Sequence, residues 1–225
     1  MNKDYIVHSD SGLRRYFAAI YQNVGIGLAV MGSIAYFMHS MKLYPRGFGG
    51  LLVMFLPMII SVGLSTNIRR MSVETAQLMY MLFSASLGIS LSAIFAIYTG
   101  ESIVSAFLST AAIFGGLSYY ARVTDRDLSK MGNILQASLI GLILSSLINM
   151  FFWSSVMNIV LSLATIVIFS GFIVYDHGML TNLYYSRVDV ETKEKIAIIG
   201  ALQLLMSFVN IFISLLSLLG ERRRD

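Results

Sequence analysis

Seven apolar runs, each close to the length that crosses a lipid bilayer, occupy most of this chain. A helix needs ~20 apolar residues to cross ~30 Å of hydrocarbon. The runs cover residues 19–39, 49–66, 77–98, 102–121, 134–152, 157–175 and 196–219. Only 12% of the 225 residues are charged, whereas soluble domains carry about 25%. Because the runs also lack the alternating pattern of a membrane barrel, the sequence predicts an all-α polytopic membrane protein with seven transmembrane helices.

Short polar segments separate the runs and leave no room for a soluble domain. We expect a cytoplasmic N-terminal segment at 1–18, a seven-helix transmembrane domain at 19–219 and a basic tail at 220–225. Residues 1–18 are polar and show no signal-peptide pattern. The longest connection, 177–195, is interpreted as a solvated cytoplasmic loop.

Basic residues gather at alternate ends of the predicted helices, before the first and after the second, fourth and sixth. Lys and Arg are enriched in cytoplasmic loops, so the pattern predicts a cytoplasmic N-terminus. The net charge of +4 is therefore attributed to membrane orientation, and no nucleic-acid partner is expected. The tail conflicts with this pattern, because Arg222, Arg223 and Arg224 would lie outside. Either the tail breaks the rule or the last helix is re-entrant, and we favour an outside tail.

The last apolar run carries a stripe of polar residues at intervals of three and four, which is one helix face. The stripe consists of Gln203, Ser207, Asn210, Ser214 and Ser217. Such a stripe faces a bundle interior or a wet cavity rather than lipid. It could form hydrogen bonds between helices or line a pathway, and either role predicts a central C-terminal helix.

Two other runs carry small or polar residues four positions apart. The two sets are Ser84, Gly88 and Ser92 in the third run, and Ala137, Gly141, Ser145 and Asn149 in the fifth. Small residues let helix backbones approach closely in lipid. We therefore expect both faces to pack against neighbouring helices.

Asp176 ends the sixth run and is the only carboxylate that we place at these runs. An acid at membrane depth is costly and often marks an ion or proton pathway. Asp176 could bind a cation, sense protons or pair with a base, or it could be an interfacial acid exposed to water. Arg70 ends the second run on the same predicted side, so the two residues could form a latch. His177 would point about 100° away on a helix and is interpreted as interfacial.

The sequence carries no convincing signature of catalysis. It has no cysteine, which excludes thiol chemistry, and it lacks H-E-x-x-H and G-x-S-x-G. Tyr175-Asp176 is similar to half of an intramembrane aspartyl protease, but that chemistry needs two carboxylates that share a proton. We expect neither an enzyme nor a bound cofactor.

Several segments carry a resemblance to a known family. They are residues 12–36, Arg70-Met71-Ser72, 88–92, Tyr98-Thr99-Gly100, 125–129 and 175–212. Their order and spacing resemble the bacterial branch of the Bax inhibitor-1 family over nearly the whole chain. The resemblance implies a seven-helix bundle around the last helix and a calcium-leak activity gated by two aspartates and a latching arginine.

The residues at the implied gate depart from the family pattern. Asp176 matches the first aspartate and Arg70 the arginine, but Ser207 stands in place of the second aspartate. Two carboxylates that share a proton titrate as a coupled pair, which Asp176 and Ser207 cannot do. Any conductance should therefore depend less on pH than in relatives. Serine also cannot replace a carboxylate as a calcium ligand, so loss of conduction is an open alternative.

The first hypothesis is a calcium-permeable leak channel or carrier in the lipid bilayer of a bacterial inner membrane, with Ca²⁺ or H⁺ as the ion. The residues expected to take part are the gate or calcium site Asp176, its latch Arg70, and the polar residues Ser207, Gln203, Asn210 and Ser214. The alternative is a non-conducting interaction protein that modulates a membrane-anchored protease or a stress response. Removal of the Asp176 charge should affect a channel, whereas an adaptor should depend more on the tails and on residues 177–195.

Overall fold

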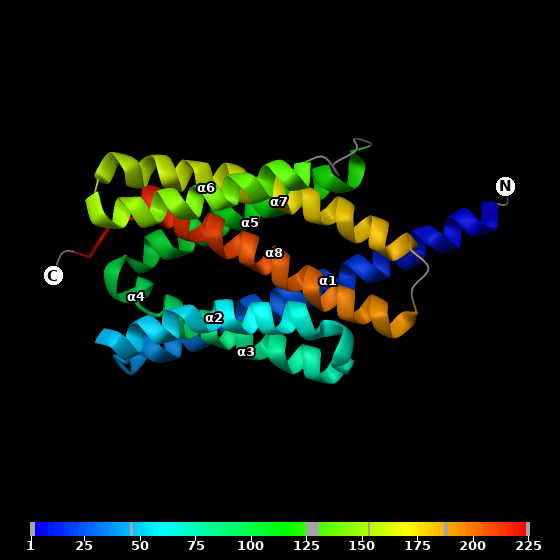
Figure 1. Ribbon diagram of the computed structural model, residues 1–225, viewed down its shortest axis with the longest axis horizontal. Coiled ribbons are helices and arrows are strands. Elements are labelled where there is room, and N and C mark those ends of the chain that lie inside the picture. Colours follow the sequence, from blue (N-terminus) through cyan, green and yellow to red (C-terminus); the bar gives the residue numbers. More distant parts are fainter. Residues whose placement is uncertain (1–2, 46, 125–130, 153, 187–188, 224–225) are drawn as a thin grey trace. The chain divides into compact units, whose positions relative to one another are not determined.

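The computed structural model in Figure 1 describes residues 3–45, 47–124, 131–152, 154–186 and 189–223. Its helices are α1 (Lys3–Ser40), α2 (Gly47–Asn67), η1 (Ile68–Arg70), α3 (Val73–Leu91), α4 (Ile94–Ile97), α5 (Gly100–Val123), α6 (Met131–Phe152), α7 (Ser155–Tyr185) and α8 (Val190–Leu219). Within the described residues, seven helical segments are long and apolar enough to cross a membrane. The prediction of an all-α protein with seven membrane-spanning helices is confirmed. Residues 125–129 of the family resemblance and Arg224 of the tail lie outside the described residues.

The helices form two compact units, and the relative positions of the two are not determined. The first unit contains Met1–Ile97 and Leu180–Leu205, and the second contains Tyr98–Met179 and Met206–Asp225. Both α7 and α8 therefore contribute residues to each unit. Lys3–Ser40 forms one continuous helix, so the predicted N-terminal segment 1–18 is helical from Lys3 onward.

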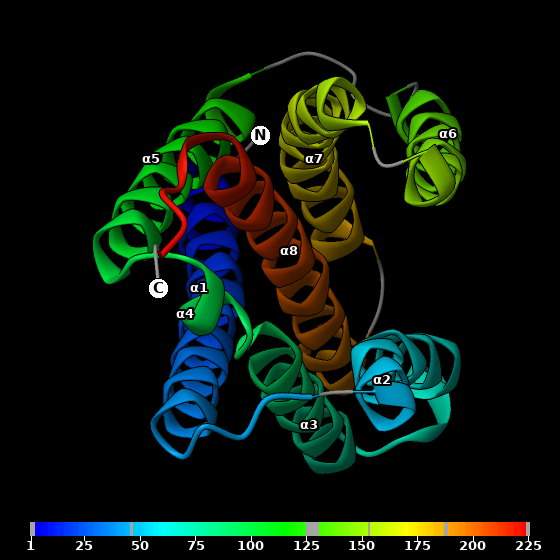
Figure 2. The same ribbon diagram turned by 90° about the vertical axis from the view of Figure 1, so that its left-hand side faces the viewer.

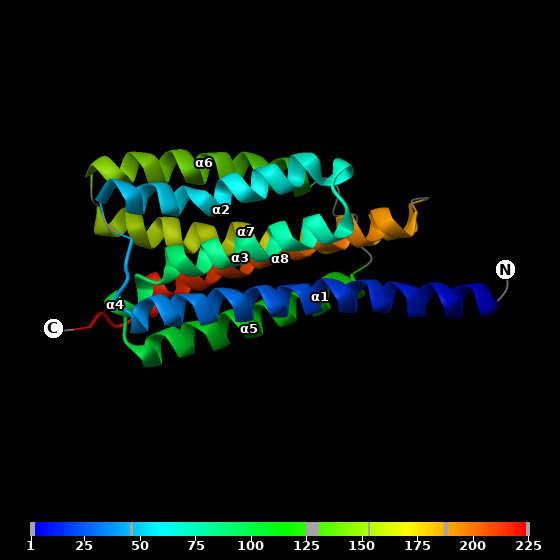
Figure 3. The same ribbon diagram turned by 90° about the horizontal axis from the view of Figure 1, so that it is seen from below.

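In the first unit, α3 packs against both α1 and α2 (Figures 2 and 3). The predicted small face of the third run forms this contact, since Ser84, Gly88 and Ser92 are all buried. A Cβ atom added at Gly88 would lie 2.5 Å from the carbonyl oxygen of Met31. The prediction of close packing is confirmed for this face, because glycine leaves the room that the α1 backbone fills.

In the second unit, the predicted packing of the small face on α6 is wrong for two of its four residues. Ala137 and Gly141 are exposed, and a Cβ at Gly141 would meet no described atom within 4 Å. The helix instead packs through a face that contains Gly132, where an added Cβ would lie 2.7 Å from the Tyr175 ring of α7. Equal spacing therefore does not decide which face of a helix is buried.

Asn149 is the buried member of the same set, and it connects α6 to α7. Its Nδ2 donates to Oδ1 of Asn158 at 2.6 Å, and its Oδ1 accepts a hydrogen bond from the backbone N–H of Ser154 at 3.2 Å. These bonds satisfy a buried amide within the turn between the two helices.

The predicted central position of the last helix is confirmed. In its most apolar window 67% of α8 is buried, against 33% or less in the other six spans. In the first unit, Leu204 and Leu205 are fully buried. In the second unit, the Phe208 ring lies 5.4 Å from the ring of Phe107 and 5.8 Å from that of Phe114. Each unit is thus built around a part of α8.

The interpretation of residues 177–195 as a solvated loop is wrong. Helix α7 continues to Tyr185 and α8 already begins at Val190. Leu180 is fully buried, and its side chain lies against Gly200, where an added Cβ would be 2.7 Å away. The apolar run stops at Asp176 because a charge ends a hydropathy pattern, but it does not interrupt the backbone hydrogen bonds of a helix.

Asp189 caps the start of α8. The Thr192 hydroxyl donates to its Oδ1 at 2.6 Å, and the Thr192 backbone N–H donates to its Oδ2 at 3.1 Å. These bonds hold the pKa of the Asp189 carboxyl below its usual value. Because the folded-state pKa is lowered, this stabilisation is complete above the unfolded pKa of about 3.9 and is lost as the pH falls through the folded value.

We expect Asp189→Ala to speed hydrogen exchange of the Thr192 amide several-fold at neutral pH, because the substitution removes the acceptor of its N–H bond. Asp189→Asn should keep most of the protection, since the amide oxygen also caps helices. Hydrogen–deuterium exchange of the first turn of α8 measures both effects. Equal exchange in the native chain and in Asp189→Ala would contradict the cap.

Candidate functional site

Asp176 lies in the interior of a long helix rather than at its end. Its side chain is only 4% exposed, and α7 continues beyond it to Tyr185. Among the described residues, no hydrogen bond or ion pair to the Asp176 carboxylate is present. Asp176 is therefore not the water-exposed acid of the alternative interpretation. Burial of its carboxylate costs free energy, which a proton, a cation or a water molecule must offset.

His177 is buried as well, with 1% of its side chain exposed. Its interpretation as an interfacial residue is therefore wrong. Helix α7 continues beyond Asp176 and His177 to Tyr185, so neither residue lies at the end of the helix. Arg122 of α5, in the same unit, interacts electrostatically with His177.

The polar stripe on α8 is divided between the two units. Ser207 and Ser214 lie in the second unit with 2% and 6% exposure, and Asn210 between them is partly exposed. The Nδ2 atom of Asn210 donates to the Met206 carbonyl oxygen at 2.8 Å. Among the described residues, no hydrogen bond to the Ser207 or Ser214 hydroxyl is present. These hydroxyls could therefore serve an ion or water.

Gln203 belongs to the first unit, and Ser217 near the other end of the stripe is exposed. The Oε1 atom of Gln203 is buried and has no hydrogen-bond partner among the described residues. A buried acceptor without a donor is costly, so Gln203 remains a candidate for water or cation contact.

Within the second unit, the parts of α7 and α8 lie side by side in Figures 1 and 2. This unit contains Asp176 on α7 and Ser207 on α8. The two positions at which the resemblance implies a pair of aspartates thus come from neighbouring helices of one unit.

Arg70 ends η1 in the first unit and is exposed, whereas Asp176 lies in the second unit. Because the relative positions of the units are not determined, the Arg70–Asp176 latch stays a prediction.

Helix α5 carries a buried polar face that was not predicted from the sequence. Thr110 is fully buried and donates its hydroxyl hydrogen to the Ala106 carbonyl oxygen at 2.7 Å. Ser118, two turns further along, is buried, and its Oγ has no hydrogen-bond partner among the described residues. The spacing of four from Ala106 to Thr110 and of eight from Thr110 to Ser118 was the available signal. Hydroxyl side chains are common in membrane helices, so this spacing alone does not distinguish a buried face from an exposed one.

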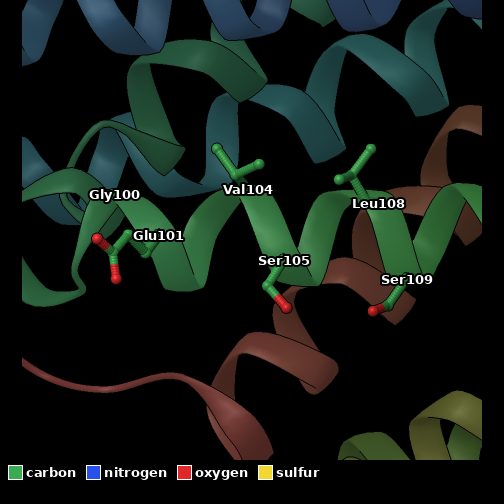
Figure 4. A pocket seen from close by; sticks show the side chains of 6 residues that line it. All are labelled: Gly100, Glu101, Val104, Ser105, Leu108 and Ser109. Atoms are coloured by element: carbon green, nitrogen blue, oxygen red, sulfur yellow. The ribbon is translucent and has the colours of Figure 1, made fainter.

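A shallow hollow runs along the opposite, exposed part of α5 (Figure 4). It is lined by Gly100, Glu101, Val104, Ser105, Leu108 and Ser109. All six residues come from one helix, so the hollow does not enclose a ligand. Among the described residues, no three or more His, Asp or Glu side chains come together. A calcium ion at Asp176 would therefore need hydroxyl, amide or carbonyl oxygens to complete its coordination.

Comparisons with known proteins extend over nearly the whole chain. A family model described as inhibitor of apoptosis-promoting Bax1 matches residues 13–224. The inner membrane protein YbhL of Escherichia coli is 34% identical over 98% of this chain and 97% of its own length. An uncharacterized protein of Rickettsia prowazekii is 36% identical over 95% of this chain and 92% of its own. An uncharacterized membrane protein of Streptococcus pyogenes is 34% identical over 97% and 98%, respectively.

Proposed function

Because the chain belongs to the Bax inhibitor-1 family of membrane proteins, we propose that it is a calcium-permeable leak channel or carrier of a bacterial inner membrane. The observation that carries this proposal is the burial of Asp176 inside a membrane-spanning helix, without a hydrogen bond or ion pair among the described residues. Carboxylates at such positions are costly and mark ion or proton pathways. A carboxylate oxygen is also the preferred ligand of a hard cation such as calcium.

In this proposal Asp176 is the cation site, and the polar residues of α8 line the path beside it. Ser207, Asn210 and Ser214 supply hydroxyl and amide oxygens, which replace part of the hydration shell of the ion. Arg70 acts as a latch that pairs with Asp176 when the path is closed. The N-terminus is cytoplasmic, in accordance with the basic residues at alternate helix ends.

Calcium flux into proteoliposomes that contain the purified protein and a trapped calcium indicator tests the proposal. Flux above that of empty liposomes is expected. If neither the native chain nor Ser207→Asp conducts, the proposal fails. The protein would then act as a non-conducting partner, and the search would turn to capture of a membrane-anchored protease.

Because Ser207 cannot share a proton with Asp176, we expect the native flux to depend less steeply on pH between pH 6 and pH 8 than the flux of Ser207→Asp. Ser207→Asp should restore a coupled pair of carboxylates and make the flux depend on pH. A group that titrates within this range changes an equilibrium by up to about tenfold per pH unit, so we expect the flux of Ser207→Asp to change roughly tenfold more than the native flux between pH 6 and pH 8. Flux at several pH values measures the effect.

Ser214→Asp is the matched control, because it adds the same charge to the same face of α8 seven positions away. Its flux should show much weaker pH dependence than that of Ser207→Asp. Equal pH dependence in the two variants would mean that added charge alone, rather than a pair with Asp176, causes the effect.

A further inference from the structure

The residues that follow α8, Gly220, Glu221 and Arg222, are named the strap here. The strap runs beside the turn that precedes α5 (Figure 2), and all of these residues belong to the second unit. The backbone N–H of Thr99 donates to the Glu221 carbonyl oxygen at 3.0 Å. The backbone N–H of Glu221 donates to Oγ of Ser102 at 2.9 Å. Tyr98 and Arg222 form an antiparallel bridge. The strap is therefore hydrogen-bonded through both the N–H and the carbonyl group of Glu221.

The close approach of the strap requires a glycine at its start. A Cβ atom added at Gly220 would lie 2.7 Å from Cδ1 of Tyr98 and would also meet the carbonyl oxygen of Leu216. The Gly220 backbone N–H itself donates to this oxygen at 2.9 Å. Glycine therefore allows the chain to leave α8 and to turn directly against the residue before α5.

The contact joins the end of α8 to the start of α5. Both Thr99 and Ser102 also form the cap of α5, since Oγ1 of Thr99 accepts a hydrogen bond from the Ser102 backbone N–H at 3.3 Å. The strap is thus bonded to the cap of one helix and continuous with the end of another. Glu221 and Arg222 are exposed, and exposed backbone hydrogen bonds open at low cost in free energy.

We propose that the strap is a detachable lock that holds the second-unit part of α8 against α5. Closed, it fixes the helix that carries Ser207, Asn210 and Ser214. Released, it allows this helix to shift and changes the polar lining. The lock itself does not depend on the transported ion, whereas its effect on flux rests on the proposed function.

The strap also agrees with an outside tail. If all seven membrane-spanning helices cross completely, the end of α8 lies on the same side of the membrane as the turn that precedes α5. The strap brings these two segments into contact. A re-entrant last helix would place them on opposite sides, so the contact favours the alternative that the basic tail breaks the charge rule.

The first experiment compares Ser102→Ala with Ser105→Ala by hydrogen–deuterium exchange of the full chain. Ser102→Ala removes the acceptor of the Glu221 N–H, and loss of one such bond should speed exchange of the Glu221 and Thr99 amides roughly fivefold. Ser105 lies on the same helix, is exposed and forms no hydrogen bond among the described residues. Its replacement should leave both amides unchanged. Unchanged exchange in Ser102→Ala would overturn the strap.

The second experiment uses the absence of cysteine from the chain. Residues opposite each other in an antiparallel pair have Cα atoms about 4.5–5.5 Å apart. This distance lies inside the range of about 4.4–6.8 Å between the Cα atoms of disulfide-bonded cysteines. Tyr98→Cys with Arg222→Cys should therefore cross-link on mild oxidation. The oxidised pair should show slower amide exchange in 206–219 and at least about fivefold lower calcium flux than the reduced pair, with both single-cysteine variants as controls.

Failure to cross-link would overturn the strap geometry. A cross-link that changes neither exchange nor flux would overturn its role as a lock. If the reduced and native proteins lack calcium flux altogether, the proposed function fails, and the exchange of residues 206–219 still decides the lock.

Discussion

Asp176→Asn is expected to lower calcium flux by about tenfold or more, because calcium affinity changes by decades with the number of charged oxygen ligands. The substitution keeps the size and shape of the side chain and removes only its charge. Asp176 is buried without a hydrogen bond or ion pair among the described residues, so the change breaks no bond that the structure describes. The proteoliposome assay with a trapped indicator measures the effect.

Glu101→Gln is the matched control for this substitution. Glu101 is an exposed carboxylate in the first turn of α5, and the change from acid to amide is the same. Its flux should remain within about twofold of the native value, since an exposed charge is screened by salt over ~8–10 Å. A higher flux in Asp176→Asn would contradict the role of Asp176 as a cation site and would assign it to closure of the path.

Gly88→Val is expected to lower the free energy of unfolding by about 3 kcal/mol, at the upper end of the range for overpacked cores. The atom nearest to an added Cβ is the backbone carbonyl oxygen of Met31, and the next is Cβ of Ile34 at 3.0 Å. Neither atom can rotate away, as the end of a long side chain could. The helices α1 and α3 must therefore separate. Thermal unfolding of the purified protein in detergent measures the loss.

Gly141→Val is the control for the second prediction. Gly141 also lies inside a membrane-spanning helix, so the change in helix propensity is the same, but an added Cβ there meets no described atom within 4 Å. Its unfolding should change by less than about 1 kcal/mol. Equal losses in the two variants would show that the propensity of valine, rather than contact between α1 and α3, controls stability.

The candidate site could be predicted from the sequence only in part. Asp176 and Ser207 were identifiable because a carboxylate and a periodic polar stripe stand out in apolar runs. The buried position of His177 and the polar face at Thr110 and Ser118 were not. A neutral hydroxyl is common in membrane helices, and its burial depends on which neighbour covers it, which a single sequence does not contain.

Sequence by itself determined the number, order and helical type of the membrane-spanning segments, and it identified α8 as the central helix. The reason is physical: bilayer thickness sets the length of an apolar run, and a polar stripe must turn away from lipid. Only the tertiary structure decided that α7 extends past Asp176, that Gly88 is packed while Gly141 is exposed, and that Glu221 bonds to Ser102, 119 residues away. Each of these depends on a contact between distant segments, and neither hydropathy nor helical spacing records which segments meet.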